Sequence, residues 1–225
     1  IDHQAKVQLA KTAELPGMTH VFGMPDLHVG KVGPVGAAFH SVDVIYPDLV
    51  GGDIGCGMHL CRTDIPARGH AIQNRIRRMG AIDNPWEGDT AELASRHGLK
   101  ETSHARSLGT IGGGNHFAEL QVVHEIVDSE AASRIGIEPD FALVLVHSGS
   151  RGLGQSVLTG HLSGGHRMGQ PVPADSDAGL AYIAGHDQAT CFARANRELI
   201  ALRFAEGLGA KTIPLLDIGH KDRKS

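Results

Sequence analysis

A carboxylate and a thiol stand three residues apart among four glycines in the segment VGGDIGCGM (50–58). Glycine lets the backbone turn sharply, so the side chains of Asp53 and Cys56 can converge on one cation. A thiol beside a cation becomes a thiolate ligand. The alternative is a tight turn that carries a buried free cysteine, and this segment alone does not separate the two.

A second glycine run, GTIGGGNHF (109–117), ends in Asn115 and His116. A flexible glycine backbone can approach a phosphate closely, and the imidazole is a candidate metal ligand. The alternative is an ordinary glycine-rich turn with a histidine facing solvent. A run of three glycines is weak evidence when it stands alone.

The apolar segment FALVLVH (141–147) is typical of a buried strand, and it delivers His147 to the glycine-rich loop SGSRGLG (148–154). Ligands are commonly held where strands end, although this residue can equally be a core histidine. Two hydroxyls and a guanidinium follow at once, and they suit an oxyanion. These three phosphate- or RNA-binding candidates are Ser148, Ser150 and Arg151.

Two further segments add acid, imidazole and amine groups. PDLHVGKVG (25–33) contains Asp26 and His28, to which we assign a supporting role beside the metal ligands, and Lys31, a phosphate candidate. The predicted strand IPLLDI (213–218) leads to His220. Mixed oxygen, sulfur and nitrogen donors favour manganese, zinc or iron over calcium or magnesium. The candidate ligands are Asp53, Cys56, His116, His147 and His220.

The elements that position these residues follow from the apolar pattern and from Gly and Pro. Apolar residues at helical spacing predict helices at residues 2–15, about 70–80 and 177–206. Strands are predicted at residues 19–24 and 42–50. The Gly- and Pro-rich stretch 24–39 between them is predicted to be an irregular loop over a site.

Length and composition bound the protein class. The 225 residues suffice for one domain, or two at most, and 41% hydrophobic residues are typical of a globular chain. A net charge of −4 excludes a broad nucleic-acid footprint, so such contacts must be local. Three cysteines without CxxC spacing predict reduced thiols, and no apolar run is long enough to span a bilayer. We therefore expect no membrane association and a cytoplasmic location.

Five segments in this order resemble successive motifs of the RtcB RNA ligases, and they cover nearly the whole chain. The closest similarity is to the release-factor-H-coupled branch of that family. The segments are PDLHVGKVGPVGAAF, VGGDIGCGM, GTIGGGNHFAEL, LVLVHSGSRGLG and AYIAGHDQATCFARANRELI.

The resemblance implies an α+β fold of mixed sheets with flanking helices, in a single domain over residues 1–225. It implies a GTP- and manganese-dependent ligase that joins RNA 2′,3′-cyclic phosphate or 3′-phosphate ends to 5′-hydroxyl ends, in RNA repair or tRNA splicing. Cys56 would bridge two manganese ions, the other candidate ligands would complete their shells, and Asn115 would contact GTP. A functional link to release factor H is also implied.

Two departures from the family pattern bear on activity. Lys221 stands where the family has an asparagine, and no residue matches the histidine that carries GMP, so we expect a chain cut short before it. The alternative function is a catalytically incomplete fragment that binds metal and RNA ends. Without the ordered motifs, the same Asp, Cys and His residues would indicate a metal-dependent hydrolase.

We predict that the chain forms no covalent protein–GMP adduct when it is incubated with labelled GTP and manganese, because the GMP-carrying histidine has no counterpart in it. Retention of label after denaturing electrophoresis measures the adduct. An acid-labile GMP adduct would contradict this expectation.

Overall fold

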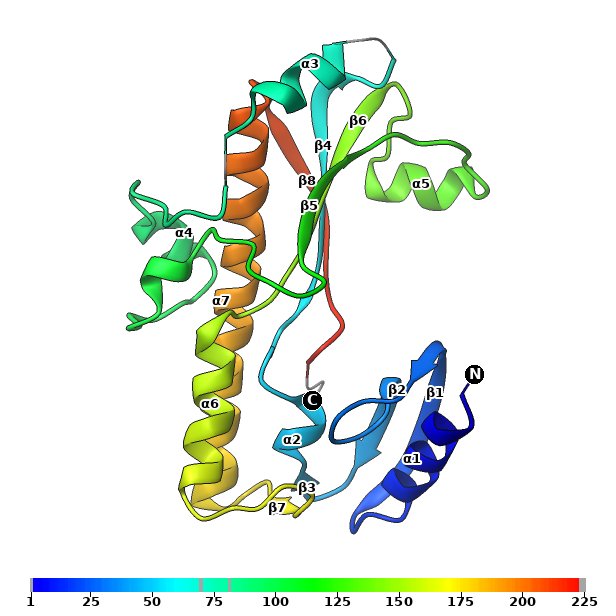
Figure 1. Ribbon diagram of the computed structural model, residues 1–225, viewed down its shortest axis with the longest axis vertical. Helices are drawn as coiled ribbons and strands as arrows, with labels where there is room; N and C mark the ends of the chain where they lie inside the picture. The colour runs from blue at the N-terminus through cyan, green and yellow to red at the C-terminus, as the bar shows by residue number, and fades with distance from the viewer. Residues whose placement is uncertain (1, 69–70, 81, 223–225) are drawn as a thin grey trace. The chain divides into compact units, whose positions relative to one another are not determined.

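The computed structural model describes residues 2–68, 71–80 and 82–222, and the fold is α+β, as predicted (Figure 1). The chain forms two compact units. Unit 1 consists of Ile1–Gly52 and Gln155–His186, and unit 2 consists of Asp53–Gly154 and Asp187–Ser225. The single-domain organisation stays a prediction. Residues 223–225 of the polar tail lie outside the described residues.

Unit 1 begins with α1 (His3–Ala13), which the side chain of Asp2 caps by accepting a hydrogen bond from the backbone N–H of Gln4 at 2.8 Å. The strands β1 (Met18–His28) and β2 (Val35–Ser41) then form an antiparallel hairpin. The predicted loop at 24–39 is therefore wrong at both ends, and only residues 29–34 between the strands are irregular. Gly36 takes φ +69°, and an added Cβ would lie 2.8 Å from the backbone of Asp26, so glycine here permits close strand approach within the hairpin.

The predicted strand at 42–50 is also mostly wrong. Only β3 (Val44–Ile45) is extended, and it pairs with β7 (Val172–Pro173). Pro47 then begins the short helix α2 (Pro47–Val50), because its fixed φ suits the first helical position.

Two helices contribute residues to both units. The helix α6 (Gly152–Ser163) replaces the second half of the predicted glycine loop. The long helix α7 (Asp177–Gly207) confirms the prediction for 177–206. Among the described residues, no helix combines the length and apolar character needed to cross a membrane.

Unit 2 is built on a four-stranded sheet in the order β5-β6-β4-β8, in which every neighbouring pair is antiparallel. The prediction from 141–147 is confirmed by the interior strand β6, whereas β4 and β5 were not predicted. The strands are β4 (Gly57–Pro66), β5 (Phe117–Gln121), β6 (Phe141–Ser148) and β8 (Thr212–Gly219).

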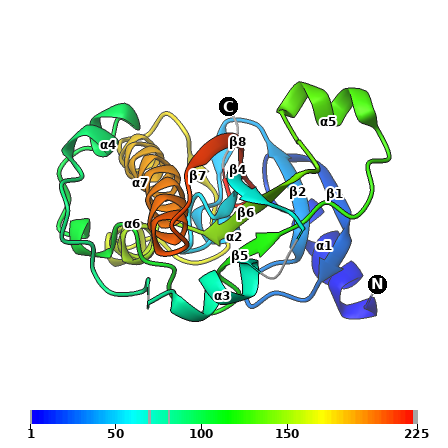
Figure 2. The same cartoon turned by 90° about the horizontal axis from the view of Figure 1, so that it is seen from above.

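One face of this sheet packs against α7 (Figure 2). Ile200 and Phe204 of the helix join Val144 and Val146 of β6 and Cys61 of β4 in one buried cluster. Each fully buried aliphatic or aromatic side chain contributes about 1.5–3 kcal/mol. This packing fixes α7 against the strands that carry the candidate ligands.

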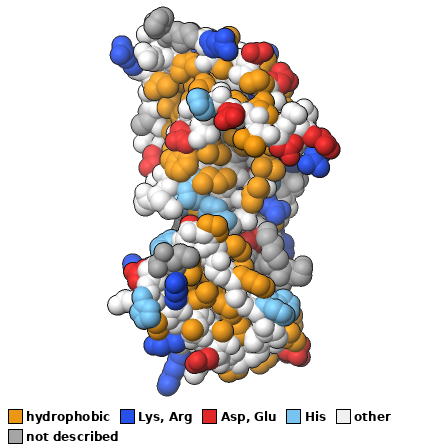
Figure 3. All heavy atoms as spheres, turned by 90° about the vertical axis from the view of Figure 1, so that its right-hand side faces the viewer, with side chains coloured by type: hydrophobic (Ala, Val, Ile, Leu, Met, Phe, Trp, Pro, Cys, Tyr) orange, Lys and Arg blue, Asp and Glu red, His pale blue; other side chains and the backbone are white. Residues whose placement is uncertain are grey.

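The strand predicted at 213–218 is present as β8. It was predicted to be buried, and this is wrong because β8 lies at the edge of the sheet. Ile213 and Ile218 are 51% and 52% exposed. The space-filling view shows many hydrophobic side chains on the side of unit 2 away from α7 (Figure 3).

The remaining elements of unit 2 are short, and the first confirms the helix predicted near 70–80. They are α3 (Ala71–Arg78), α4 (Ala91–Arg96), a 3-10 turn (Ala105–Ser107) and α5 (Ser129–Ile135).

Candidate metal centre

The antiparallel order of the sheet brings four candidate ligands to one end. Gly57, the first residue of β4, lies opposite both Ser148 of β6 and Gly219 of β8, and Phe117 of β5 lies opposite His147. The starts of β4 and β5 therefore meet the ends of β6 and β8. The residues in or beside these positions are Cys56, His116, His147 and His220.

The side chains of Cys56, His116 and His147 point at one another. The Sγ atom of Cys56 lies 3.2 Å from Nε2 of His147 and 3.5 Å from Nε2 of His116. The three donor atoms all lie within 4.8 Å of one another. Donors bound to one ion at about 2.0–2.3 Å stand about 3–4 Å apart, so this spacing fits a shared cation.

Asp53 and His220 extend the same cluster. Oδ2 of Asp53 lies 3.0 Å from Nε2 of His116, and Nε2 of His220 lies 3.2 Å from Nε2 of His147. The backbone N–H of His220 donates to the carbonyl of Cys56 at 2.9 Å, which ties the last residue of the cluster to the thiol loop. All five predicted ligands are therefore in one place in unit 2.

Two backbone carbonyls fix which nitrogen each imidazole turns to the cluster. Nδ1 of His116 lies 3.0 Å from the carbonyl of Ile111, and Nδ1 of His147 lies 3.0 Å from that of Asn115. A carbonyl only accepts, so each Nδ1 carries the proton. In the neutral ring of His147, the Nε2 lone pair then faces the cluster, as metal ligation requires. Nε2 of His116 lies 3.0 Å from the Asp53 carboxylate and would have to release a proton to ligate a metal.

The electrostatics favour neutral donors around one carboxylate. Burial raises the pKa of the Cys56 thiol to about 12, and the Asp53 charge adds to this. Burial also lowers the pKa of His147 and of His220. Burial raises the pKa of Asp53, but hydrogen bonds from His116 and Cys56 outweigh it, and the pKa lies below its usual value. A bound cation would reverse the effect on the thiol, because a coordinated thiol loses its proton.

The backbone around the cluster leaves room for its carboxylate. At Gly149 an added Cβ would overlap the carboxylate of Asp53, so a side chain here would displace that carboxylate from its position. One carboxylate, one thiol and three imidazoles, with two of the rings oriented by carbonyls, form a donor set that fits a divalent transition metal.

Arg151 lies just beyond this set. It takes φ 55°, a sparsely populated conformation for a non-glycine residue that is common at functional sites. Its Nε donates to Oγ1 of Thr110 at 3.1 Å, and an added Cβ at Gly112 would overlap its guanidinium. The guanidinium is thus held against the glycine-rich loop that carries His116.

The other predicted phosphate contacts differ in accessibility. Asn115 is exposed, whereas Ser148 and Ser150 are fully buried. The hydroxyl of Ser148 donates to the carbonyl of Ile111 at 3.0 Å and so supports the loop. The hydroxyl of Ser150 is buried without a hydrogen-bond partner among the described residues.

Three predicted residues belong to unit 1. Asp26 and His28 lie in β1, where Nδ1 of His28 donates to the carbonyl of Asp26 at 2.7 Å, and Lys31 lies in the exposed turn after it. Their roles beside the metal or the phosphate stay predictions.

Sequence reasoning missed a polar network on the buried side of the sheet. Arg197 of α7 and Asp217 of β8 form a two-point ion pair, with Nη2 to Oδ1 at 2.6 Å and Nε to Oδ2 at 2.9 Å. Nδ1 of His59 lies 3.3 Å from Oδ2 of Asp217. The signal that could have revealed this network is the pair Asn196 and Arg197, which interrupts the otherwise apolar buried face of α7.

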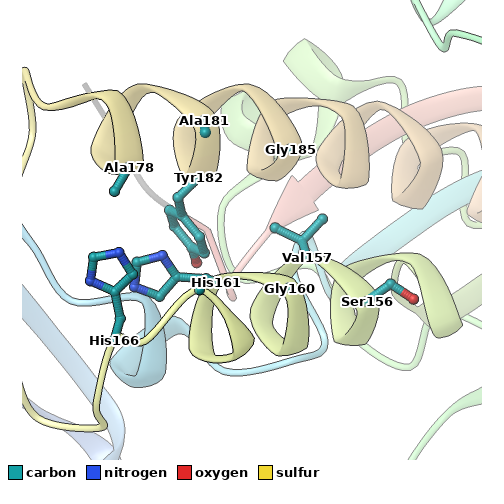
Figure 4. A pocket seen from close by; sticks show the side chains of 10 residues that line it. Ser156, Val157, Gly160, His161, His166, Ala178, Ala181, Tyr182 and Gly185 are labelled. Atoms are coloured by element: carbon teal, nitrogen blue, oxygen red, sulfur yellow. The ribbon is translucent and has the colours of Figure 1, made fainter.

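A hollow of about 370 Å³ in unit 1 is lined by none of the predicted ligands (Figure 4). The rings of His161 and His166 stack there at 4.3 Å, and Tyr182 packs edge-on against His161. Small residues of α6 and α7, such as Gly160 and Ala181, leave the space open.

The fold and this site define a class of protein: an α+β protein with an Asp/Cys/His cluster at one end of an antiparallel sheet. A family model described as "tRNA-splicing ligase RtcB" matches residues 8–83 and 69–214. The chain belongs to the RtcB family.

Known relatives agree with this assignment. The chain is 46% identical over 220 residues to an Escherichia coli protein named RNA-splicing ligase RtcB2, covering 98% of this chain and 58% of the relative. It is 34% identical to a Nanoarchaeum equitans tRNA-splicing ligase RtcB, over 86% of this chain and 53% of that one. A Mycobacterium tuberculosis RtcB is 29% identical, over 95% and 65%. The chain thus spans somewhat more than half the length of these relatives.

The ion pair between Arg197 and Asp217 predicts acid sensitivity. Burial raises the pKa of Asp217, but His59 and Arg197 outweigh it and lower the pKa from 3.8 to about 2. This contribution to stability is complete above about pH 4 and is lost as the pH falls towards 2. It amounts to about 1–2 kcal/mol after allowance for the partial exposure of the carboxylate.

We expect Asp217→Asn to be less stable than the native chain at pH 6, with the difference shrinking between pH 4 and pH 2. Urea unfolding across this range measures it. Asp140→Asn, in an exposed turn, is the control. A difference that stays constant with pH would contradict the assignment.

Proposed function

We propose that this cluster is the metal centre of a GTP- and manganese-dependent RNA ligase. The ligase joins 2′,3′-cyclic phosphate or 3′-phosphate ends of RNA to 5′-hydroxyl ends. The observation that carries the proposal is the convergence of one carboxylate, one thiol and three imidazoles in a chain of the RtcB family. The relatives named as RNA-splicing or tRNA-splicing ligases support the substrate class.

The residues of this chain would divide the work as follows. Cys56 and the other four cluster residues would together hold two divalent ions. Bound divalent ions supply charge neutralisation for phosphate oxygens and orient them. The carbonyls of Ile111 and Asn115 keep the Nε2 atoms of His116 and His147 turned inward. Gly149 leaves the space that the Asp53 carboxylate occupies.

The anionic RNA would bind to a few positively charged side chains and not to a broadly basic surface. The chain has a net charge of −4, so RNA binding depends on particular groups. Arg151 can hold a terminal phosphate through two parallel hydrogen bonds, because its guanidinium is already fixed by Thr110. Asn115 would contact the phosphates of GTP, and Lys31 the RNA.

Cys56→Ala should weaken manganese binding by more than about 100-fold, because it removes the donor that the other ligands surround. The electron paramagnetic resonance signal of free manganese during titration measures the affinity. Cys191→Ala is the matched control, because Cys191 lies on α7 outside the cluster. Equal manganese affinity in the Cys56→Ala variant and the native chain would place the metal elsewhere.

Arg151→Ala should reduce binding of a short RNA with a 3′-phosphate by about 10- to 100-fold, the equivalent of losing a charge-assisted hydrogen bond. Binding of the same RNA with a 3′-hydroxyl should change little. Fluorescence anisotropy in the presence of manganese measures both. Arg134→Ala on α5 is the control. A native chain that binds the two RNAs equally would contradict the proposed recognition of the phosphate end.

A further inference from the structure

Two adjacent polar residues of α7, Asn196 and Arg197, are both fully buried against the sheet of unit 2. Burying a guanidinium is unfavourable unless its donors are paired. The hydrogen-bond partners of the Arg197 guanidinium therefore indicate which segments this buried side chain holds together.

Arg197 joins three segments that carry candidate ligands. Its Nη1 donates to the carbonyl of Gly55 at 2.6 Å and to that of Ser148 at 3.0 Å. Gly55 precedes Cys56, and Ser148 follows His147. The ion pair with Asp217 adds β8, the strand that leads to His220. The guanidinium of Arg197 thus connects the loop before β4 with the end of β6 and with β8.

Asn196 joins the segments that Arg197 does not reach. Its Oδ1 accepts from the backbone N–H of Gly109 at 2.7 Å, and its Nδ2 donates to the carbonyl of Thr110 at 3.2 Å. These residues begin the loop that carries His116. Nδ2 also lies 3.2 Å from the carbonyl of Gly149, the glycine that accommodates the Asp53 carboxylate.

The two residues meet at Ser148. The Nδ2 of Asn196 donates to its hydroxyl at 3.1 Å, and that hydroxyl donates to the carbonyl of Ile111. The same carbonyl of Ile111 accepts from Nδ1 of His116. A continuous set of hydrogen bonds therefore runs from α7 to the ring of a candidate ligand.

We propose that Asn196 and Arg197 are positioning residues that hold the five donor side chains at coordination spacing, with α7 as the rigid support. The inference rests on the proposed metal centre. Residues that orient ligands in this way typically change metal affinity by about 10- to 100-fold when they are substituted.

The test uses Arg197→Lys and Asn196→Ser. Lysine keeps the charge but cannot form the planar contacts to Gly55, Ser148 and Asp217 together. Serine replaces the carboxamide with a single hydroxyl and is too short to reach both loops. Arg194→Lys is the control, because Arg194 is exposed on the same helix.

Each variant is saturated with Co²⁺, and its visible absorption spectrum and its affinity for manganese are measured beside its urea unfolding. We expect both variants to unfold cooperatively, to bind manganese about 10- to 100-fold more weakly and to show an altered cobalt spectrum. The control should match the native chain in all three measurements.

Folded variants with native affinity and a native cobalt spectrum would overturn the inference while leaving the metal centre intact. Loss of cooperative unfolding in both variants would also count against it, because the network would then hold the fold rather than the donor spacing. A native chain whose metal binding is insensitive to Cys56→Ala would overturn the proposed centre together with this inference.

Discussion

The crowding of a thiol, a carboxylate and three imidazoles within a few ångströms is the constraint on which the rest of this structure depends. The donor atoms of Cys56, His116 and His147 lie within 4.8 Å of one another in a largely buried place, and Asp53 and His220 each contact one of the rings. Such an arrangement is favourable when a cation occupies the centre, and the protein must hold the donors together until one does. The antiparallel register of the sheet in unit 2 does so by bringing two strand starts and two strand ends to the same edge.

The surroundings of the cluster follow from that constraint. Backbone carbonyls orient two rings, glycine leaves space for the carboxylate at position 149, and a buried Asn-Arg pair ties the loops to α7. The apolar packing of α7 on β4 and β6 supplies the rigidity, because close-packed side chains resist displacement. The hydrogen bonds thus set the positions of the donor side chains, and the packing of α7 on the sheet holds those positions.

The sequence predicted which reactive side chains lie together better than it predicted the strands that carry them, and their role as ligands stays a prediction. Asp53, Cys56 and His116 stand out as reactive side chains in glycine-rich segments, and His147 and His220 follow apolar runs. The strand β4 was missed because its core face carries His59 and Thr63, which are buried through hydrogen bonds to Cys61 and to the carbonyl of Ala142. Ala142 is distant from Thr63 in sequence, and the contact between His59 and Cys61 depends on their sharing one face of a strand. The strand predicted at 19–24 lies within β1, but the rest of β1 and all of β2 were missed because strand pairing outweighed the glycines.

X-ray absorption at the zinc edge of the zinc-loaded protein shows whether Cys56 and the histidines bind one metal ion together. Bound zinc should show a sulfur neighbour at about 2.3 Å together with nitrogen neighbours at about 2.0–2.1 Å. A zinc environment of nitrogen and oxygen alone, with no sulfur at bonding distance, would show that Cys56 is not a ligand and that the metal binds elsewhere.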